Sequence, residues 1–236
     1  MNLLSSKHVA VIGCGSGGGA LAHMLAKDGV EMFTLVDADK VEAANLKRHV
    51  LDRDYVGQPK VVAMKGHLRK INERVRVSAL SEKFNGLPEK PDIICGCTDS
   101  LACDSLINAY AVQNGVPAVF GGVHGDAHTV EIITYVPAEG PCFECWEREG
   151  ELPQPTQEKY TNPDYDSTKM PSQQGLWGDV LMAASLQFQA VLGILGSREK
   201  FPPLVLKSLR YPFKLETYDQ GERCAVCSSD FSRLTA

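Results

Sequence analysis

Short apolar runs alternate with helix-like segments through the first half of the chain. The apolar runs have the length of strands and cover residues 8–12, 31–36, 75–80, 92–96 and 116–120. Between them, apolar side chains recur at helical spacing over residues 16–28, 60–71 and 100–114, with Pro59 as the expected first helical residue of the second segment. This alternation is typical of a doubly wound α/β fold, in which a mostly parallel sheet carries helices on both faces.

After Gly121-Gly122 the pattern changes. Strand-like runs and one long apolar helix are expected at residues 129–136, 178–196, 204–211 and 215–218. Residues 150–174 are polar and contain prolines, which predicts a mobile loop. We expect a single domain over residues 1–236, with an α/β core in 1–140 and the crossover loop, the long helix and the last strands in 141–236.

Composition narrows the class of protein. The 236 residues are 44% hydrophobic and 22% charged, which is ordinary for a globular protein with a sizeable core. A formal net charge of −5 provides no basic surface for a nucleic acid backbone. The polar residues 1–7 do not fit a signal peptide, and no segment has the length of a membrane span. We therefore expect a cytoplasmic protein that binds neither nucleic acid nor membrane.

The first predicted strand leads into a glycine-rich turn. Gly13-x-Gly15-x-x-Gly18 opens the following helix, and Asp37 ends the second strand, 19 residues after Gly18. Glycines let a phosphate approach the backbone, the first helical N–H groups face the anion, and an acidic side chain accepts hydrogen bonds from ribose hydroxyls. The pattern predicts a nucleotide site and leaves NAD and ATP equally open. A tight turn without a ligand is the minority alternative.

Five further polar residues follow the predicted strands, namely Asp39, Asn45, Arg48, Lys60 and Asp99. Arg and Lys neutralise phosphate oxygens, and an Asp at a strand end can hold Mg²⁺ with its waters. Taken alone, each charge could be a solvated surface group, and Asp99 could simply belong to a helix start. Their joint placement at strand ends favours a triphosphate with Mg²⁺ over a dinucleotide. The chain has no P-loop sequence.

The eight cysteines divide into two groups. Cys142-x-x-Cys145 and Cys224-x-x-Cys227 are two pairs at the spacing that a tetrahedral structural zinc site uses. A redox role for each pair is the alternative, and zinc is the stronger hypothesis because two pairs rarely serve two separate redox functions. The remaining cysteines lie in or beside predicted core elements, where a thiol behaves as a small hydrophobe: Cys14, Cys95, Cys97 and Cys103.

These motifs, taken in order, resemble those of the HesA/MoeB/ThiF superfamily, the adenylating fold shared with ubiquitin-activating enzymes. The resemblance extends from about His8 to the terminal cysteine pair. It rests on both cysteine pairs and on the segments Gly13-Cys14-Gly15-Ser16-Gly17-Gly18, Val36-Asp37-Ala38-Asp39, Asn45-Leu46-Lys47-Arg48, Val56-Gly57-Gln58-Pro59-Lys60 and Cys97-Thr98-Asp99-Ser100.

The resemblance implies an ATP- and Mg²⁺-dependent adenylyltransferase. The C-terminal glycine carboxylate of a ubiquitin-like or sulfur-carrier protein would attack the α-phosphate of ATP, giving an acyl-adenylate and pyrophosphate. Asp37 resembles the acid that binds ribose, and Asp99 the carboxylate linked to Mg²⁺. Asn45, Arg48 and Lys60 resemble the residues that handle phosphate, and catalysis would be mostly positioning and charge neutralisation. A homodimer or heterodimer is also implied.

Three alternatives stay open at this point. They are an NAD(P) oxidoreductase, a silent partner subunit, and a fuller activating enzyme that passes the acyl group to its own nucleophile, to a conjugating enzyme or to a sulfur donor. Relatives that form a thioester or persulfide carry a cysteine before the long C-terminal helix, and no cysteine lies between Cys145 and Cys224 here. We expect the reaction to stop at the adenylate, or at most to use a hydroxyl such as that of Ser172.

Overall fold

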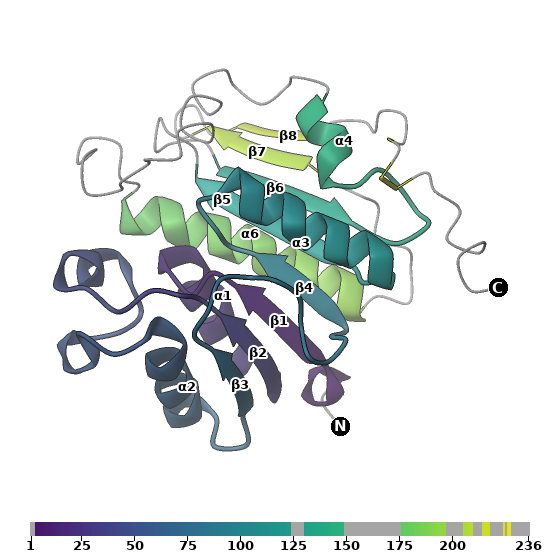
Figure 1. Ribbon diagram of the computed structural model, residues 1–236. Coiled ribbons are helices and arrows are strands. Elements are labelled where there is room, and N and C mark those ends of the chain that lie inside the picture. The colour runs from purple at the N-terminus through teal and green to yellow at the C-terminus, as the bar shows by residue number, and fades with distance from the viewer. Residues whose placement is uncertain are drawn as a thin grey trace.

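A single eight-stranded sheet forms the centre of the protein in the computed structural model (Figure 1). The structure describes residues 3–123, 130–148, 176–196, 205–209, 214–217, 224 and 226–227. The strand order is β3-β2-β1-β4-β5-β6-β7-β8. The strands are β1 His8–Ile12, β2 Met32–Val36, β3 Arg76–Leu80, β4 Ile93–Gly96, β5 Ala118–Val123, β6 Val130–Tyr135, β7 Val205–Leu209 and β8 Lys214–Thr217.

The first five strands are parallel and the last three are antiparallel. β3, β2, β1, β4 and β5 pair in parallel, so their carboxyl ends share one edge of the sheet. β6, β7 and β8 extend the same sheet by antiparallel pairing. The predicted parallel sheet is therefore confirmed for the first five strands, and strands from the later part of the chain complete the sheet.

Helices cover both faces of this sheet, as the alternation of elements predicts (Figure 1). The helices are α1 Ser16–Lys27, α2 Lys60–Ile71, α3 Leu101–Asn114, α4 Phe143–Arg148 and α6 Trp177–Gly196. Val9 and Val11 of β1 pack into the cluster formed with α1, α2 and α6. Ala10 and Ile12 point to the other face, into the cluster formed with α3 and α4. Successive residues of one strand thus bury opposite faces, which makes the fold doubly wound.

Local capping explains several helix boundaries. The Ser100 hydroxyl accepts a hydrogen bond from the backbone N–H of Cys103, which caps the start of α3. Gly115 ends that helix with φ at 57°, a left-handed conformation that favours glycine. Pro59 is the cap of α2 and lies just outside the helix, so its predicted place as first helical residue is wrong by one position. Its lack of an N–H suits that place equally well.

Two other predictions need correction. The fifth strand begins at Ala118 and continues through Gly121-Gly122 to Val123, because both glycines pair with β6. The helix Trp177–Gly196 is long and apolar enough to cross a membrane, so the expectation that no segment has that length is wrong. In the structure this helix packs against α1, β5 and β6, which accounts for its apolar composition. The predicted mobile loop at 150–174 and Ser172 lie outside the described residues.

Candidate nucleotide site and cysteine cluster

The glycine turn between β1 and α1 is held by close backbone contacts. Gly13 has φ at 89°, and a Cβ on it would lie 2.5 Å from the carbonyl oxygen of Cys97. A Cβ on Gly18 would collide with the carbonyl oxygen of Gly13. A Cβ on Gly15, in contrast, would meet no atom within 4 Å. Gly13 and Gly18 are therefore required by the fold itself, while Gly15 leaves open space at the start of α1.

Asp37 fastens this turn to the end of β2. Its Oδ2 accepts a hydrogen bond of 2.7 Å from the backbone N–H of Cys14, and its Oδ1 accepts one of 2.8 Å from the N–H of Asp39. The side chain is 8% exposed. Burial raises the pKa of Asp37, whereas Lys60 and the two backbone donors lower it, and burial prevails. Asp37 thus orders the glycine turn, and its role as ribose acceptor stays a prediction.

Lys60 places a cation at the same edge. Its Nζ lies 2.7 Å from Oδ2 of Asp39 and 3.9 Å from Oδ2 of Asp37. Burial alone would lower the pKa of Lys60, but the charges of Asp37, Asp39 and Asp99 together raise it, so the ammonium stays protonated. The Asp39 side chain is 71% exposed and is thus the open end of the cluster. These residues come from the ends of β2 and β4 and the start of α2.

Asp99 follows β4 and is exposed just before the N-terminus of α3. The turn that carries it is ordered by Thr98, whose hydroxyl donates a 2.9 Å hydrogen bond to Oδ1 of Asp104. The backbone N–H of Ser100 in turn donates to the Thr98 hydroxyl at 3.3 Å. An exposed carboxylate on an ordered turn, close enough to influence Lys60, is suited to hold a hydrated cation such as Mg²⁺ beside a phosphate.

Asn45 and Arg48 lie between β2 and α2. Both are half-buried on a short 3-10 helix, η2, which spans Ala43–Arg48, and a second one, η3, spans Arg53–Tyr55. The next residue, His49, is buried, and its Nε2 lies 3.0 Å from the carbonyl oxygen of Cys14. The segment that carries Arg48 is thereby fixed to the glycine turn. The sequence analysis missed His49 because a single histidine after Arg48 belongs to no recognisable pattern.

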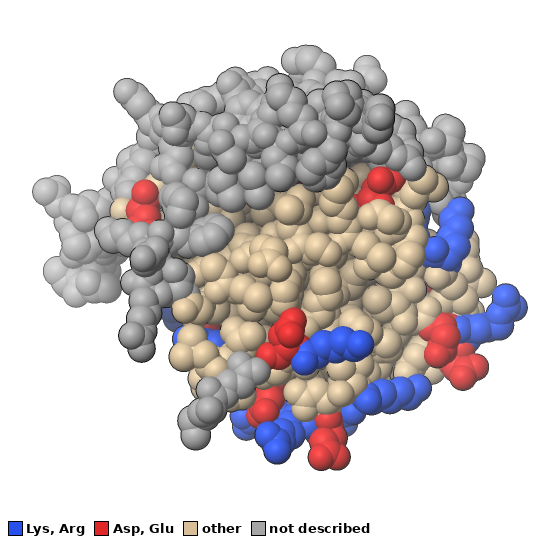
Figure 2. Space-filling view, turned by 180° about the vertical axis from the view of Figure 1, so that it is seen from behind, with Lys and Arg blue, Asp and Glu red and all other residues tan. Residues whose placement is uncertain are grey.

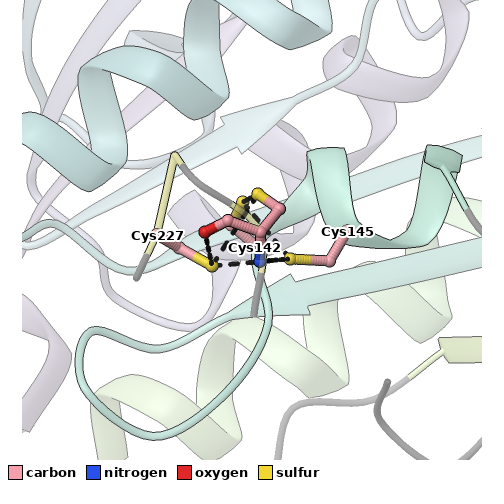
Figure 3. A group of neighbouring side chains, drawn as sticks. Cys142, Cys145 and Cys227 are labelled. Carbon is pink, nitrogen blue, oxygen red and sulfur yellow. Dashed lines mark hydrogen bonds between the residues drawn. The ribbon is translucent and has the colours of Figure 1, made fainter. Parts of the chain in front are cut away.

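The four paired cysteines come together on the α3 side of the sheet, with their sulfurs pointing toward one another (Figure 3). The Sγ–Sγ distances are 4.0 Å for Cys142–Cys145, 3.8 Å for Cys142–Cys224, 3.4 Å for Cys145–Cys227 and 4.0 Å for Cys224–Cys227. Four sulfurs bound to a tetrahedral zinc at about 2.3 Å lie about 3.8 Å apart. The cluster therefore has the dimensions of a Cys₄ zinc site, as the spacing predicts.

Three thiols of this cluster differ in their pKa. Burial raises the pKa of Cys142 and raises that of Cys145 to about 11, so of these three only Cys224 is favoured as a thiolate before a metal binds. Burial raises the pKa of the Cys224 thiol, but hydrogen bonds from the backbone of Cys227 and Val226 outweigh it and lower the pKa to about 7. Asn108 of α3 is fully buried, and its Nδ2 lies 3.5 Å from Sγ of Cys142. Its Oδ1 accepts a 3.0 Å hydrogen bond from the N–H of Phe143. Asn108 is a second residue that the sequence analysis missed.

The other four cysteines are confirmed as core or near-core thiols. Cys14 and Cys95 are buried, and burial raises the pKa of each well above its usual value. Cys97 and Cys103 are half-buried, and burial raises the pKa of Cys97 to about 12 and that of Cys103 to about 11. These thiols stay protonated near neutral pH, so they are poor nucleophiles.

The fold defines a doubly wound α/β protein, and its charged edge is a candidate nucleotide site at the carboxyl ends of the parallel strands. More particularly, the ThiF family model matches residues 1–209, and the chain belongs to the ThiF family.

Three similar proteins illustrate this membership. The sulfur carrier protein adenylyltransferase of Thermus thermophilus is 28% identical over 242 residues, covering 96% of this chain and 84% of the relative. The adenylyltransferase and sulfurtransferase UBA4 of Yarrowia lipolytica is 27% identical over 244 residues, covering 98% of this chain and 58% of the relative. A crystal structure of E. coli MccB with ATP has the same fold, with a TM-score of 0.78 at 24% identity over 96% of this chain and 67% of that one. The chain thus spans only about half the length of UBA4.

Proposed function

We propose that this protein catalyses the ATP-dependent adenylation of the C-terminal carboxylate of a ubiquitin-like or sulfur-carrier protein. The observation that carries the proposal is the cluster of Lys60, Asp37, Asp39 and Asp99 beside the glycine turn, in a chain of the ThiF family. A cation held between carboxylates at the ends of parallel strands is suited to a magnesium triphosphate. The two phosphates of a dinucleotide do not need so many charged groups.

Each residue of the site has a distinct role in binding ATP or in neutralising its charge. The open start of α1 at Gly15 receives the phosphates, whose negative charge the helix N-terminus favours. Lys60, with Arg48 and Asn45, neutralises and orients the phosphate oxygens, while Asp99 holds Mg²⁺, which supplies further charge neutralisation when bound. We assign Asp37 and Asp39 to the ribose, whose hydroxyls can donate hydrogen bonds to carboxylates. The ammonium of Lys60 stays fixed during the reaction, so its charge is preorganised.

The chemical step is a displacement at phosphorus. A carboxylate oxygen of the carrier's last glycine attacks the α-phosphate of ATP, forming a new C–O–P linkage. The bond from the α-phosphorus to the bridging oxygen breaks, and pyrophosphate leaves with that electron pair. The attacking group is already ionised, so this step needs no general base, and positioning plus charge neutralisation provides the catalysis.

The carrier class follows from the relatives. The Thermus thermophilus protein is a sulfur carrier protein adenylyltransferase, and the Bacillus subtilis relative, 32% identical over 150 residues, is a sulfur carrier protein ThiS adenylyltransferase. We extend the same substrate class, a small carrier with a glycine C-terminus, to this chain. Because the described cysteines outside the zinc cluster are protonated thiols, we also propose that the reaction of this chain stops at the adenylate.

We propose that Cys142, Cys145, Cys224 and Cys227 hold one structural zinc. The positions of the four sulfurs support this proposal. The hydrogen bonds from Asn108 and from backbone N–H groups support it as well, because each of these hydrogen bonds stabilises a thiolate. Such a metal would tie the C-terminal residues to α4 and thereby contribute to folding.

We propose a location in the reducing cytoplasm, which fits the eight cysteines, because none of them is in a disulfide.

We also propose that the protein is a dimer, formed through the face of α1 and α6. Viewed from behind, the protein has a broad surface with few charged side chains (Figure 2). The two helices carry only two charged residues, Lys27 and Asp179, and Asp179 is buried. Two copies can bury such a face without leaving a charged side chain buried and unpaired.

Light scattering of a Ser185→Glu, Gln189→Glu variant tests the proposed dimer interface, because both positions are exposed on α6. The variant should be monomeric if the face is the interface, and a dimer of unchanged affinity would contradict it.

ATP–pyrophosphate exchange in the presence of candidate carrier proteins tests the proposed activity. Exchange should require both the carrier and its terminal glycine. Asp99→Asn should lower the exchange rate at least about tenfold, the scale of losing one preorganised charge at a reacting centre. Asp92→Asn is the matched control, because Asp92 lies just before β4, at the opposite end of the same strand, and pairs with Lys7. Binding of NAD without binding of ATP would overturn the proposal in favour of an oxidoreductase.

A further inference from the structure

His49 joins two segments of the candidate nucleotide site, the glycine turn and its own segment after η2, through its two ring nitrogens. Nε2 lies 3.0 Å from the carbonyl oxygen of Cys14, in the glycine turn. Nδ1 accepts a 3.1 Å hydrogen bond from the backbone N–H of Leu51, in its own segment. The N–H of Cys14 donates to Oδ2 of Asp37, so both polar backbone groups of Cys14 are held, one by each neighbouring segment.

These partners determine the tautomer of the ring. A backbone N–H can only donate, so Nδ1 must be the unprotonated nitrogen facing Leu51. A carbonyl can only accept, so Nε2 carries the proton and donates it to Cys14. The neutral Nε2–H form therefore satisfies both contacts, and a proton on Nδ1 would break the contact with Leu51.

Packing leaves the ring no alternative place. His49 is 9% exposed, and its Cε1 lies 3.0 Å from where a Cβ on Gly19 would be. The first turn of α1 thus has a glycine where the imidazole lies against it. Displacing the ring would require either the helix or the η2 segment to shift.

We propose that His49 is a positioning residue for nucleotide binding, which keeps the glycine turn in register with the segment that carries Asn45 and Arg48. This inference rests on the proposed function. It follows from the hydrogen bonds that run from Leu51 through the imidazole to Cys14, and on to Asp37. Phosphates held between Gly15 and Arg48 would bind weakly if these two elements could slide apart, because positioning determines the strength of several contacts at once.

The groups around His49 keep it neutral near physiological pH. Burial lowers its pKa, the carbonyl of Cys14 raises it, and the charge of Lys60 lowers it, with a net lowering. His67 of α2 interacts electrostatically with His49, and its Nε2 lies 2.9 Å from Nδ1 of His23 on α1. The pKa of His67 is lowered to about 4, chiefly because of burial. Acidification that protonates His49 should therefore loosen the glycine turn, because Nδ1 can then no longer accept from Leu51.

The experiment compares His49→Leu with His49→Gln in two measurements on the full chain. His49→Leu removes both hydrogen bonds, whereas the amide Nε2 of Gln can still donate to the carbonyl of Cys14. His8→Leu is the matched control, because His8 is a half-buried, hydrogen-bonded histidine at the amino end of β1, far from the carboxyl edge. The first measurement is the ATP dissociation constant by titration calorimetry, and the second is hydrogen exchange of the ligand-free protein over residues 13–19.

His49→Leu should weaken ATP binding about tenfold, the scale of a lost buried hydrogen bond, with a larger effect on KM than on kcat. It should also speed exchange in the glycine turn of the ligand-free protein. His49→Gln should recover most of both losses. Relative to the intrinsic amide exchange rate, which itself falls in acid, the protection of the turn should decrease more on acidification in the wild type and in His8→Leu than in either His49 variant. His8→Leu should change neither measurement.

Equal exchange in wild type and His49→Leu would overturn the inference, and so would failure of His49→Gln to recover any of the loss. If the wild type binds no ATP, the proposed function fails. The exchange measurement still decides whether His49 holds the turn.

Discussion

Replacing Lys60 by Met tests the buried charge cluster, because the change removes the cation and keeps the length of the side chain. Lys60 Nζ and Oδ2 of Asp37 are 3.9 Å apart, and the two side chains are 12% and 8% exposed. At this distance and an effective dielectric constant of about 20, two unit charges attract by about 4 kcal/mol, most of which offsets the cost of burying them. Lys60→Met leaves Asp37 buried without its cation. We expect the free energy of unfolding to fall by about 2 kcal/mol.

Lys7→Met is the matched control for this change. Lys7 Nζ lies 3.5 Å from Oδ1 of Asp92, and these side chains are 29% and 39% exposed. A pair in contact with water contributes little, so we expect a loss of under about 0.5 kcal/mol. Urea unfolding followed by circular dichroism measures both variants against the wild type.

The pH dependence of the stability loss in Lys60→Met tests whether the loss comes from the charge of buried Asp37. Burial raises the pKa of Asp37 and Lys60 opposes the rise, so the variant should raise that pKa further. A carboxyl whose folded pKa exceeds its unfolded value favours folding at low pH, and this contribution is lost as pH rises through the folded pKa. The stability gap between variant and wild type should therefore narrow in acid, as Asp37 becomes protonated. Equal losses for Lys60→Met and Lys7→Met, or a gap that is constant from about pH 8 to about pH 5, would refute this reasoning.

Three more predictions concern the zinc cluster and the glycine turn. Cys224→Ser, or prolonged chelation of the wild type, should remove zinc and lower the unfolding free energy by about 2 kcal/mol or more, as measured by metal analysis with urea titration; zinc-free wild-type protein of full stability would contradict this. Asn108→Leu should speed the transfer of zinc to a colorimetric chelator about tenfold, since Cys142 loses its donor; unchanged transfer would contradict it. Gly18→Ala should prevent folding because of the collision with Gly13, whereas Gly15→Ala should fold and bind ATP more weakly, as judged by circular dichroism and calorimetry.

Elements with a strong local signal could be predicted from the sequence. β1, the start of α3 at its Ser100 cap and the end of α3 at Gly115 lie where the pattern placed them, because each depends on residues close in the chain. The cysteine pairs were equally predictable as a cluster, since the spacing within each pair reflects the geometry of a metal site. The sequence indicated the segment that carries Arg48, but it could not predict which atoms the Arg48 side chain contacts.

What the sequence could not provide depends on contacts between distant residues. The antiparallel direction of β6 to β8 is set by pairing across the sheet, and a strand pattern alone does not specify direction. The helix at 177–196 is apolar because it packs against α1 and two strands. Composition alone cannot distinguish such a buried helix from one that spans a membrane. His49 and Asn108 act on residues about 35 positions away in the chain, without any motif to mark them.

Labelled ATP tests the proposed adenylation most directly. The protein is incubated with a candidate carrier and with ATP labelled at either the α- or the γ-phosphate, and the products are separated under denaturing conditions. Attack at the α-phosphate predicts that α-label stays on the carrier as a hydroxylamine-sensitive acyl-adenylate, while γ-label leaves as pyrophosphate. Release of γ-label as inorganic phosphate with ADP, or the absence of α-label from every carrier that ends in glycine, would contradict adenylation at this site.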